Sequence, residues 1–342
     1  MLKDHHEKGQ TIAEQETPVN SRDGSLAAVA VAVAVGALVT LAGSQGGYEV
    51  SGLAVFAWGA IVAYGLNWIA YVPSAVLRTE KFFDLMGSVT YLSVTVAALV
   101  LVGRYDTRSV LLAAMVAIWA ARLGSFLLRR VMAAGSDSRF DSIKTDPLRL
   151  LSTWTLQGLW VLLTIAAALG AITASADPGL DWLVWAGLAV WAVGFAIEVT
   201  ADLQKSAFKA DPDNDGRFID VGLWSWSRHP NYFGEIVLWV GVAMASVGAL
   251  SGWRYATLVS PLFVFVLLRF VSGDDGPPLG GYGARLSINP FRYWLRTTFD
   301  DQYYSRLFLP AEGTHDPTLP GDVKALVLVD ARGERIVWLL SL

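Results

Sequence analysis

Long apolar runs alternate with short polar connections along most of this chain. Glu49 is the only charged residue in 25–77, and Asp84 is the only one in 82–103. A helix of about 20 apolar residues crosses the hydrocarbon core of a bilayer. Runs of this length predict transmembrane helices at residues 25–43, 52–77, 82–103, 109–129, 152–174, 180–203, 230–251 and 254–272.

The pattern predicts an all-α fold, a polytopic transmembrane helical bundle with about eight spans. The range is seven to nine, because the last two runs are joined so tightly that they also fit a hairpin that does not cross fully. We expect a cytosolic tail over 1–24, the membrane domain over 25–273 and an atypical cytosolic tail over 274–342. The first tail lacks the apolar run of a signal peptide. Within the last tail, 324–340 predicts a β-hairpin.

The distribution of lysine and arginine predicts the orientation. Of 26 such residues, only Arg104, Arg108 and Arg254 fall in connections on one side, and Arg122 lies inside a span. The others gather in both tails and the three longer loops on the other side. By the positive-inside rule, both termini are therefore predicted to be cytosolic.

Composition narrows the function classes. The chain is 54% hydrophobic and 16% charged, with a net charge of −4, so no basic surface for nucleic acid is expected. The absence of cysteine excludes disulfides, thiolate nucleophiles and cysteine metal sites. The loop around Asp211, Asp213 and Asp215 resembles the start of a calcium-binding EF-hand, but Gly222 stands where a bidentate glutamate is required, and we expect a solvated turn.

Polar residues inside the predicted spans are candidates for function, because they are costly in a bilayer. Helix rise places them all in the cytosolic half of the membrane, which favours a polar cavity open to the cytosol. Structural roles stay open, namely an ion pair between Arg122 and Glu198 and interhelical hydrogen bonds from the amides. The residues concerned are Asn67, Tyr91, Arg122, Gln157, Glu198 and Glu235.

The stretch GLWSWSRHPNYFGEIVLW, at 222–239, carries the most chemistry. Pro230 fits the first position of a helix. Arg228 and His229 would then stand at a helix N-terminus, which favours an anion such as phosphate. Asn231 and Glu235 share one helix face. The alternative is a snorkelling arginine with interfacial tryptophans and a helix cap.

The string SRHPNYFGE with the preceding GLW resembles the signature of the steroid 5α-reductase family, particularly its bacterial membrane branch. RTEKFFDLMGSVTYLSVT, IWAARLGSFLLRR, TWTLQGLWV and ADLQKSAFKADP are also similar to that branch, so the likeness covers about residues 50–273. Sterol C14-reductases carry a similar run, and isoprenylcysteine carboxyl methyltransferases a shorter one. Residues 274–342 do not follow the segment with which relatives close their cofactor site.

The resemblance implies a helical bundle that binds NADPH in a cavity facing the cytosol. By motif match, the implied cofactor contacts are Arg228, His229, Asn231, Tyr232 and Glu235, with Asp213, Asn214 and Arg217 as further candidates in the preceding loop. Family members donate a proton from a glutamate and a tyrosine while hydride reaches the substrate. Glu80 and Tyr91 occur in the corresponding order.

Glu80 as an acid requires a raised pKa, which burial against lipid-facing Phe82 and Phe83 would supply. The alternative is that Glu80 pairs with Lys81 or Arg78 at the interface and that Tyr91 only packs.

These observations predict an oxidoreductase of the bacterial inner membrane. It would use NADPH to reduce a C=C bond conjugated to a carbonyl in a lipophilic substrate, steroid-like or isoprenoid, that enters from the membrane lipid, with no obligatory protein partner. An S-adenosylmethionine-dependent methyltransferase is the alternative enzyme. A membrane carrier is a third possibility, although the spans show no inverted repeats.

Overall fold

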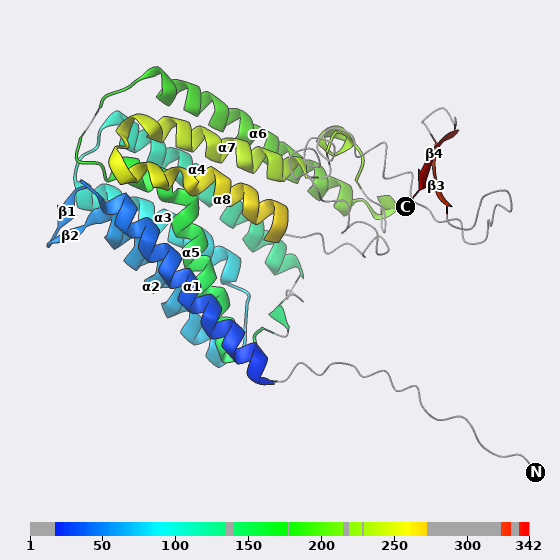
Figure 1. The fold of residues 1–342 in the computed structure, drawn as a ribbon, viewed down its shortest axis with the longest axis horizontal. Helices are drawn as coiled ribbons and strands as arrows, with labels where there is room; N and C mark the ends of the chain where they lie inside the picture. Colours follow the sequence, from blue (N-terminus) through cyan, green and yellow to red (C-terminus); the bar gives the residue numbers. More distant parts are fainter. Residues whose placement is uncertain are drawn as a thin grey trace, which may run out of the picture. The chain divides into compact units, whose positions relative to one another are not determined.

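The fold is seen in a computed structural model that describes residues 18–134, 140–141, 143–176, 178–214, 219–227, 229–271, 323–329 and 335–341. Its long helices are α1 (Pro18–Ser44), α2 (Val55–Leu77), α3 (Phe83–Val102), α4 (Thr107–Ala134), α5 (Pro147–Ile172), α6 (Trp182–Ala210) and α7 (Pro230–Ser246). All seven contain a segment that is long and apolar enough to cross a bilayer (Figure 1). The chain is therefore an all-α, multi-pass membrane protein, and the count lies within the predicted range.

The segment predicted as the eighth span is not one continuous α-helix. It forms a 3-10 helix (Gly252–Leu258), the short helix α8 (Val259–Val266) and a π-helical turn (Leu267–Val271). Pro261 is the third residue of α8, and because proline has no N–H to donate it fits the first turn of a helix, which agrees with a start at Val259.

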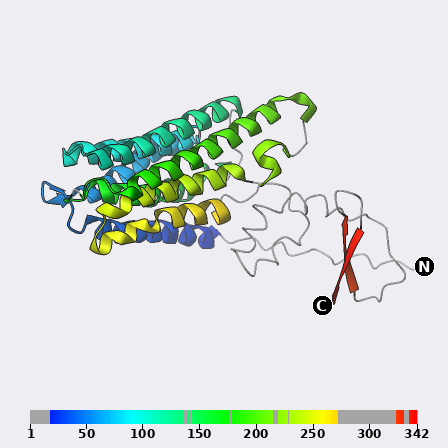
Figure 2. The same cartoon turned by 90° about the horizontal axis from the view of Figure 1, so that it is seen from above.

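Two short hairpins accompany the helices. Strands β1 (Glu49–Val50) and β2 (Leu53–Ala54) join α1 to α2, and β3 (Val323–Val329) pairs antiparallel with β4 (Arg335–Ser341). The second hairpin, drawn in red in Figure 2, confirms the β-hairpin predicted near the C-terminus.

The chain divides into two compact units, which we describe separately. Unit 1 comprises 1–184 and 245–260, and unit 2 comprises 185–244 and 261–342. In unit 1, α5 is the central helix and packs against α1, α2, α3 and α4. Its C-terminal half is almost entirely buried, and the small side chains of the AAALGAI segment, 166–172, allow neighbouring helices to come close. Asp146 caps its N-terminus by accepting hydrogen bonds from two backbone N–H groups, next to Pro147 at the first position.

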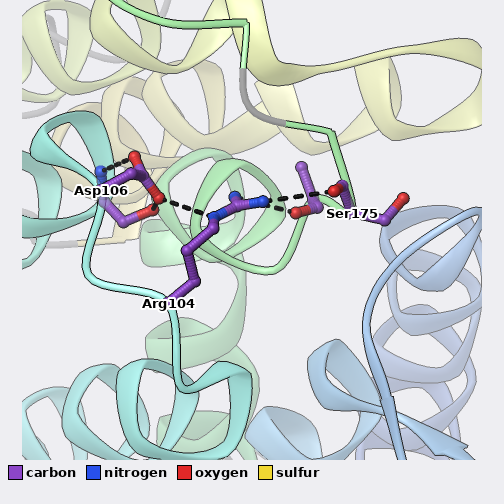
Figure 3. A network of polar contacts seen from close by, with 5 residues as sticks. Arg104, Asp106 and Ser175 are labelled. Atoms are coloured by element: carbon purple, nitrogen blue, oxygen red, sulfur yellow. Dashed lines mark hydrogen bonds and ion pairs between the residues drawn. The ribbon is translucent and has the colours of Figure 1, made fainter.

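Of the three arginines predicted on the non-cytosolic side, Arg104 and Arg254 bond to carbonyls at or just after the C-terminal end of α5, and Arg108 bonds to the segment just before α6. Arg104 donates to the carbonyl oxygens of Ala174 and Ser175, at 3.1 and 3.2 Å, and pairs with Asp106 at 3.0 Å (Figure 3). Arg108 pairs with Asp181 at 2.9 Å and donates to the Gly179 carbonyl at 2.7 Å.

The third of these arginines, Arg254, is 1% exposed and donates to the carbonyls of Gln45, Gly170 and Thr173 at 2.7, 3.2 and 3.2 Å. Like Arg104, it therefore satisfies backbone groups where α5 ends, because the last carbonyls of a helix have no partner within it.

The carboxylates of this end should make the fold sensitive to acid. Burial alone would raise the pKa of Asp106, but hydrogen bonds from Ser109 and Arg104 outweigh it and lower that pKa below 3.8. A carboxyl whose pKa is lower in the folded state stabilises the fold fully above its unfolded pKa, and this contribution is lost as the pH falls below 3.8. Asp106→Asn should therefore reduce the acid-dependent drop in melting temperature, measured from pH 6 to pH 3, while leaving unit 2 unaffected. An unchanged acid profile would contradict this role.

Candidate functional site

In unit 2, the GLW turn is fixed on α6. Gly222 has a φ of +61°, a conformation that favours glycine. The N–H of Leu223 donates to Oε1 of Gln204 at 2.9 Å, and the buried indole of Trp224 donates to the carbonyl of Ala201 at 2.9 Å. The ammonium of Lys205 lies 4.7 Å from the centre of the Trp224 ring. These contacts anchor the turn that precedes α7 to the side of α6.

The start of α7 confirms the prediction for Pro230, which is its first residue. The backbone N–H of His229 donates to Oγ of Ser227 at 3.2 Å, and the carbonyl of His229 accepts from Phe233 at 3.1 Å. The His229 ring stacks on Tyr232, with centroids 5.0 Å apart and planes inclined by 13°. The motif therefore presents a stacked ring pair at the helix N-terminus.

A polar contact joins α6 to α7 inside unit 2. Nδ2 of Asn231 donates to Oδ1 of Asp202 at 3.1 Å, and the Asp202 side chain is buried. Because a carboxylate only accepts, this bond orients the amide, and Oδ1 of Asn231 is then a buried acceptor with no hydrogen-bond partner in the described part of the chain. Glu198 is also buried and precedes Asp202 by four residues, so both lie on one face of α6.

This face forms because glycines let the two backbones touch. A Cβ added to Gly234 would lie 2.5 Å from the backbone nitrogen of Glu198, and one added to Gly194 would lie 2.5 Å from that of Leu238. Gly241 approaches Trp191 in the same way. Gly234 stands between Asn231 and Glu235 in the motif, and Glu235 shares the face of Asn231 by its spacing. The result is a face of acidic and amide groups that can accept several hydrogen bonds.

The remaining predicted cofactor contacts lie in the loop before the motif. Nδ2 of Asn214 donates to the carbonyl of Phe208 at 3.2 Å, so this side chain caps the end of α6. The N–H of Asp213 bonds to the Asp211 carboxylate at 3.0 Å, within an exposed turn. Arg217 and Arg228 lie outside the described residues.

The two predicted catalytic residues belong to unit 1. The Glu80 side chain is 5% exposed, and Oε2 lies 3.4 Å from Nζ of Lys144, which also pairs with Asp141 at 2.8 Å. The sequence suggested the neighbouring Arg78 and Lys81 as partners of Glu80. Lys144 lies 64 residues away along the chain, so sequence proximity does not point to it. Lys144 could be placed here only by the tertiary fold.

The surroundings of Glu80 differ from the prediction. Phe83 does not face lipid: it is buried in a cluster with Phe140, Leu150 and Trp154, whereas Phe82 is exposed. Which of these two adjacent phenylalanines faces the interior depends on how the start of α3 is oriented against its neighbours. The sequence does not show that orientation.

Tyr91 lies further along α3. Its ring meets Trp119 edge to face, with centroids 5.0 Å apart. Eight residues of helix separate Tyr91 from Phe83, a rise of roughly 12 Å. Glu80 and Tyr91 are therefore held at different levels of unit 1.

Sequence reasoning did not single out Asp202 or Lys144. A signal for Asp202 was present, because it follows Glu198 by four residues within an otherwise apolar span. No comparable signal marks Lys144.

Comparisons with known proteins agree with the resemblance seen in the sequence. Two curated relatives match. The chain is 32% identical over 122 residues to "Probable O-methyltransferase ustE" of Ustilaginoidea virens, which covers 33% of this chain and 40% of that protein. It is 30% identical over 92 residues to "3-oxo-5-alpha-steroid 4-dehydrogenase 1" of Bos taurus, covering 26% of this chain and 34% of that protein.

The chain thus spans less than half the length of either relative, and no solved structure matches it. A family model described as "Protein of unknown function (DUF1295)" matches residues 70–275, which include both helices of the polar face and both predicted catalytic residues. The chain belongs to this DUF1295 family, whose members are steroid 5α-reductase-like.

Proposed function

We propose that this protein is a reductase of the bacterial inner membrane that uses NADPH to reduce a C=C bond conjugated to a carbonyl. The substrate would be lipophilic, steroid-like or isoprenoid, and would enter from the bilayer. The observation that carries the proposal is the polar face of α6 and α7, where the Asn231 amide is oriented by Asp202 and leaves Oδ1 as a buried acceptor. Buried polar groups in a membrane protein are rarely kept without a function.

The hydrogen-bond donors of NADPH are complementary to this face of α6 and α7. Its ribose hydroxyls and its carboxamide are hydrogen-bond donors, and Asn231, Asp202 and Glu235 offer acceptors. The stacked pair of His229 and Tyr232 adds a flat surface at the helix N-terminus. When bound, this cofactor would supply a hydride to the β-carbon of the substrate.

The protein's own part in the reaction would be to polarise the carbonyl and deliver a proton. Oε2 of Glu80 lies 3.4 Å from Nζ of Lys144, and a carboxylate in such an ion pair accepts hydrogen bonds and does not donate them. We therefore propose Tyr91 as the proton donor, and Glu80 as a charged group that orders the entry to α3.

The alternative is an S-adenosylmethionine-dependent methyltransferase. The match to the O-methyltransferase of Ustilaginoidea virens favours it, because that match is longer than the one to the steroid dehydrogenase. Ribose hydroxyls are common to both cofactors, so the acceptors on α6 and α7 serve either one.

Thermal unfolding of the detergent-purified protein with NADPH, NADH and S-adenosylmethionine side by side separates these proposals. A ligand that binds only the folded state raises the melting temperature. Selective stabilisation by NADPH supports the reductase. A response to S-adenosylmethionine alone supports the methyltransferase, and no response to any of them contradicts both and favours a carrier.

Variants of the polar face should weaken cofactor binding without unfolding the chain. Asn231→Ala removes the oriented acceptor, and Glu235→Ala removes the carboxylate on the same face. We expect the affinity for NADPH to fall about tenfold in each, since one hydrogen bond contributes ~0.5–1.5 kcal/mol and 1.4 kcal/mol is a factor of ten. Isothermal titration calorimetry measures this affinity. Thr200→Ala, on the exposed side of α6, is the control, and an affinity unchanged in both variants would refute the site.

A further inference from the structure

The turn that joins α2 to α3 in unit 1 carries three charged residues, and the structure places them on different sides. The Glu80 side chain is 5% exposed and faces Lys144. Arg78 and Lys81 are exposed, and no ion-pair partner for either is found in the part of the chain that the structure describes. Because its only carboxylate faces inward, the outer surface of this turn is cationic.

Hydrogen bonds fix the shape of the turn. The N–H groups of Arg78 and Thr79 both donate to the carbonyl of Ser74, and the Ser74 hydroxyl donates to the carbonyl of Thr79. Trans peptide links join Arg78 to Lys81 three residues later, so their Cα atoms lie at most about 11 Å apart. The two cations therefore belong to one small surface.

The backbone of Arg78 is strained. Its φ and ψ are +48° and +50°, the left-handed conformation in which glycine commonly ends a helix. A residue with a Cβ costs stability there. The negative end of the α2 dipole favours a cation at this position, but it does not account for the second exposed cation, Lys81. Strain at an exposed charged residue points to a use for its side chain.

Exposed apolar side chains lead along α2 to this cationic surface. Their spacing places them on one face of the helix, which we call the apolar stripe. The stripe consists of Ile61, Ile69, Val72 and Val76. Leu77, which is 70% exposed, precedes the two cations, and Phe82, which is 60% exposed, follows them. In a chain that crosses a bilayer, such a face contacts the acyl chains of lipids. The apolar stripe therefore ends where the positive charges begin.

We propose that the cationic surface of Arg78 and Lys81, together with the apolar stripe of α2, binds an anionic phospholipid. Guanidinium and ammonium groups both bind phosphate oxygens, and basic residues next to a membrane surface attract anionic lipids. A phospholipid joins its acyl chains directly to its head group, which matches the order of stripe and cations along α2. In a zwitterionic lipid, the positive group of the head opposes this attraction.

This surface belongs to unit 1 and is distinct from the polar face of α6 and α7. The inference does not rest on the proposed function, because it involves neither the cofactor nor the reaction. Its test is therefore carried out without a cofactor, and either proposal can fail while the other holds.

The experiment compares two phospholipids with the same chains, the anionic dioctanoyl phosphatidylglycerol and the zwitterionic dioctanoyl phosphatidylcholine. Each is titrated into the full-length protein in an uncharged detergent, and the melting temperature reports binding to the folded state. We expect the wild-type chain to bind the phosphatidylglycerol several-fold more tightly. Lys81→Gln should lower that affinity about fivefold, since a basic residue near the membrane surface contributes ~1 kcal/mol and 1.4 kcal/mol is a factor of ten. The affinity for phosphatidylcholine should not change.

Arg78→Gly separates lipid binding from stability. It removes the cation and relieves the left-handed backbone, so without lipid the variant should be no less stable than the wild-type chain. Its affinity for phosphatidylglycerol should nevertheless fall about fivefold. The double variant, Arg78→Gly with Lys81→Gln, should bind both lipids equally.

Two controls complete the test. Lys209→Gln removes an exposed lysine from the end of α6, in unit 2, and should keep the preference for phosphatidylglycerol although it changes the net charge equally. Glycerol 3-phosphate offers the phosphate without acyl chains and should not stabilise the protein. The proposal is overturned if both lipids act equally on the wild-type chain, including by having no effect, or if the double variant keeps the preference. It is also overturned if Lys209→Gln loses the preference, or if glycerol 3-phosphate acts as well as the lipid.

Discussion

Gly234→Ala is expected to lower the free energy of unfolding by about 3 kcal/mol, at the upper end of the ~1–3 kcal/mol range for overpacking. The added methyl would lie 2.5 Å from the backbone nitrogen of Glu198 and 2.7 Å from the carbonyl oxygen of Gly194. Backbone atoms cannot move aside as the end of a side chain can, so α6 and α7 must separate. The separation would also break the contact between Asn231 and Asp202, and the polar face with it.

Chemical denaturation in detergent micelles measures this loss, and Gly194→Ala should reproduce it from the other helix. Gly65→Ala in α2 is the matched control, because nothing lies within 4 Å of its added Cβ. Alanine favours the helix over glycine, so the control should be neutral or slightly stabilising. Equal stability of the Gly234 and Gly65 variants would show that the two helices are not in backbone contact.

Arg254→Met is expected to cost about 3 kcal/mol or more, since each buried polar group left without a partner costs ~1–3 kcal/mol. The guanidinium bonds to the carbonyls of Gln45, Gly170 and Thr173, and Gly170 and Thr173 belong to the end of the central helix of unit 1. A lysine at this position could not span three carbonyls, because its charge sits on a single nitrogen. Arg254→Lys should therefore recover only part of the loss.

The melting temperature in detergent reports this effect, with Arg149→Met as the control. The Arg149 side chain is exposed, and only its backbone takes part in the cap of α5. If Arg254→Met and Arg149→Met have the same melting temperature, Arg254 does not stabilise the end of α5. If Arg254→Lys fully recovers the stability lost in Arg254→Met, the effect comes from the positive charge and not from the several N–H donors of the guanidinium.

Much of the membrane domain could be predicted from sequence, because the period and length of apolar runs are local properties. The helix α7 begins at Pro230 as predicted, since the reason lies in one residue that lacks an N–H. The hairpin of β3 and β4 was predicted from its strand pattern. The eighth span was predicted as continuous because hydropathy does not distinguish an α-helix from the mixed helical turns around Pro261.

The predicted site was harder to judge from sequence. The four-residue spacing of Asn231 and Glu235 placed them on one face, but Asp202, which orients Asn231, comes from a different helix. Glu80 was expected beside lipid-facing aromatics, whereas Phe83 turned out to be buried and Lys144 supplied the counter-charge. Both differences concern partners distant in the chain.

The sequence by itself determined that this chain crosses the membrane many times, where its helices run, and which motif marks it as steroid 5α-reductase-like. These properties follow from composition, periodicity and local motifs. The tertiary structure alone decided that Gly194 and Gly234 bring two backbones together, that Arg254 bonds to the end of α5, and that Lys144 lies beside Glu80. Each of these depends on atoms that meet only after distant helices have packed.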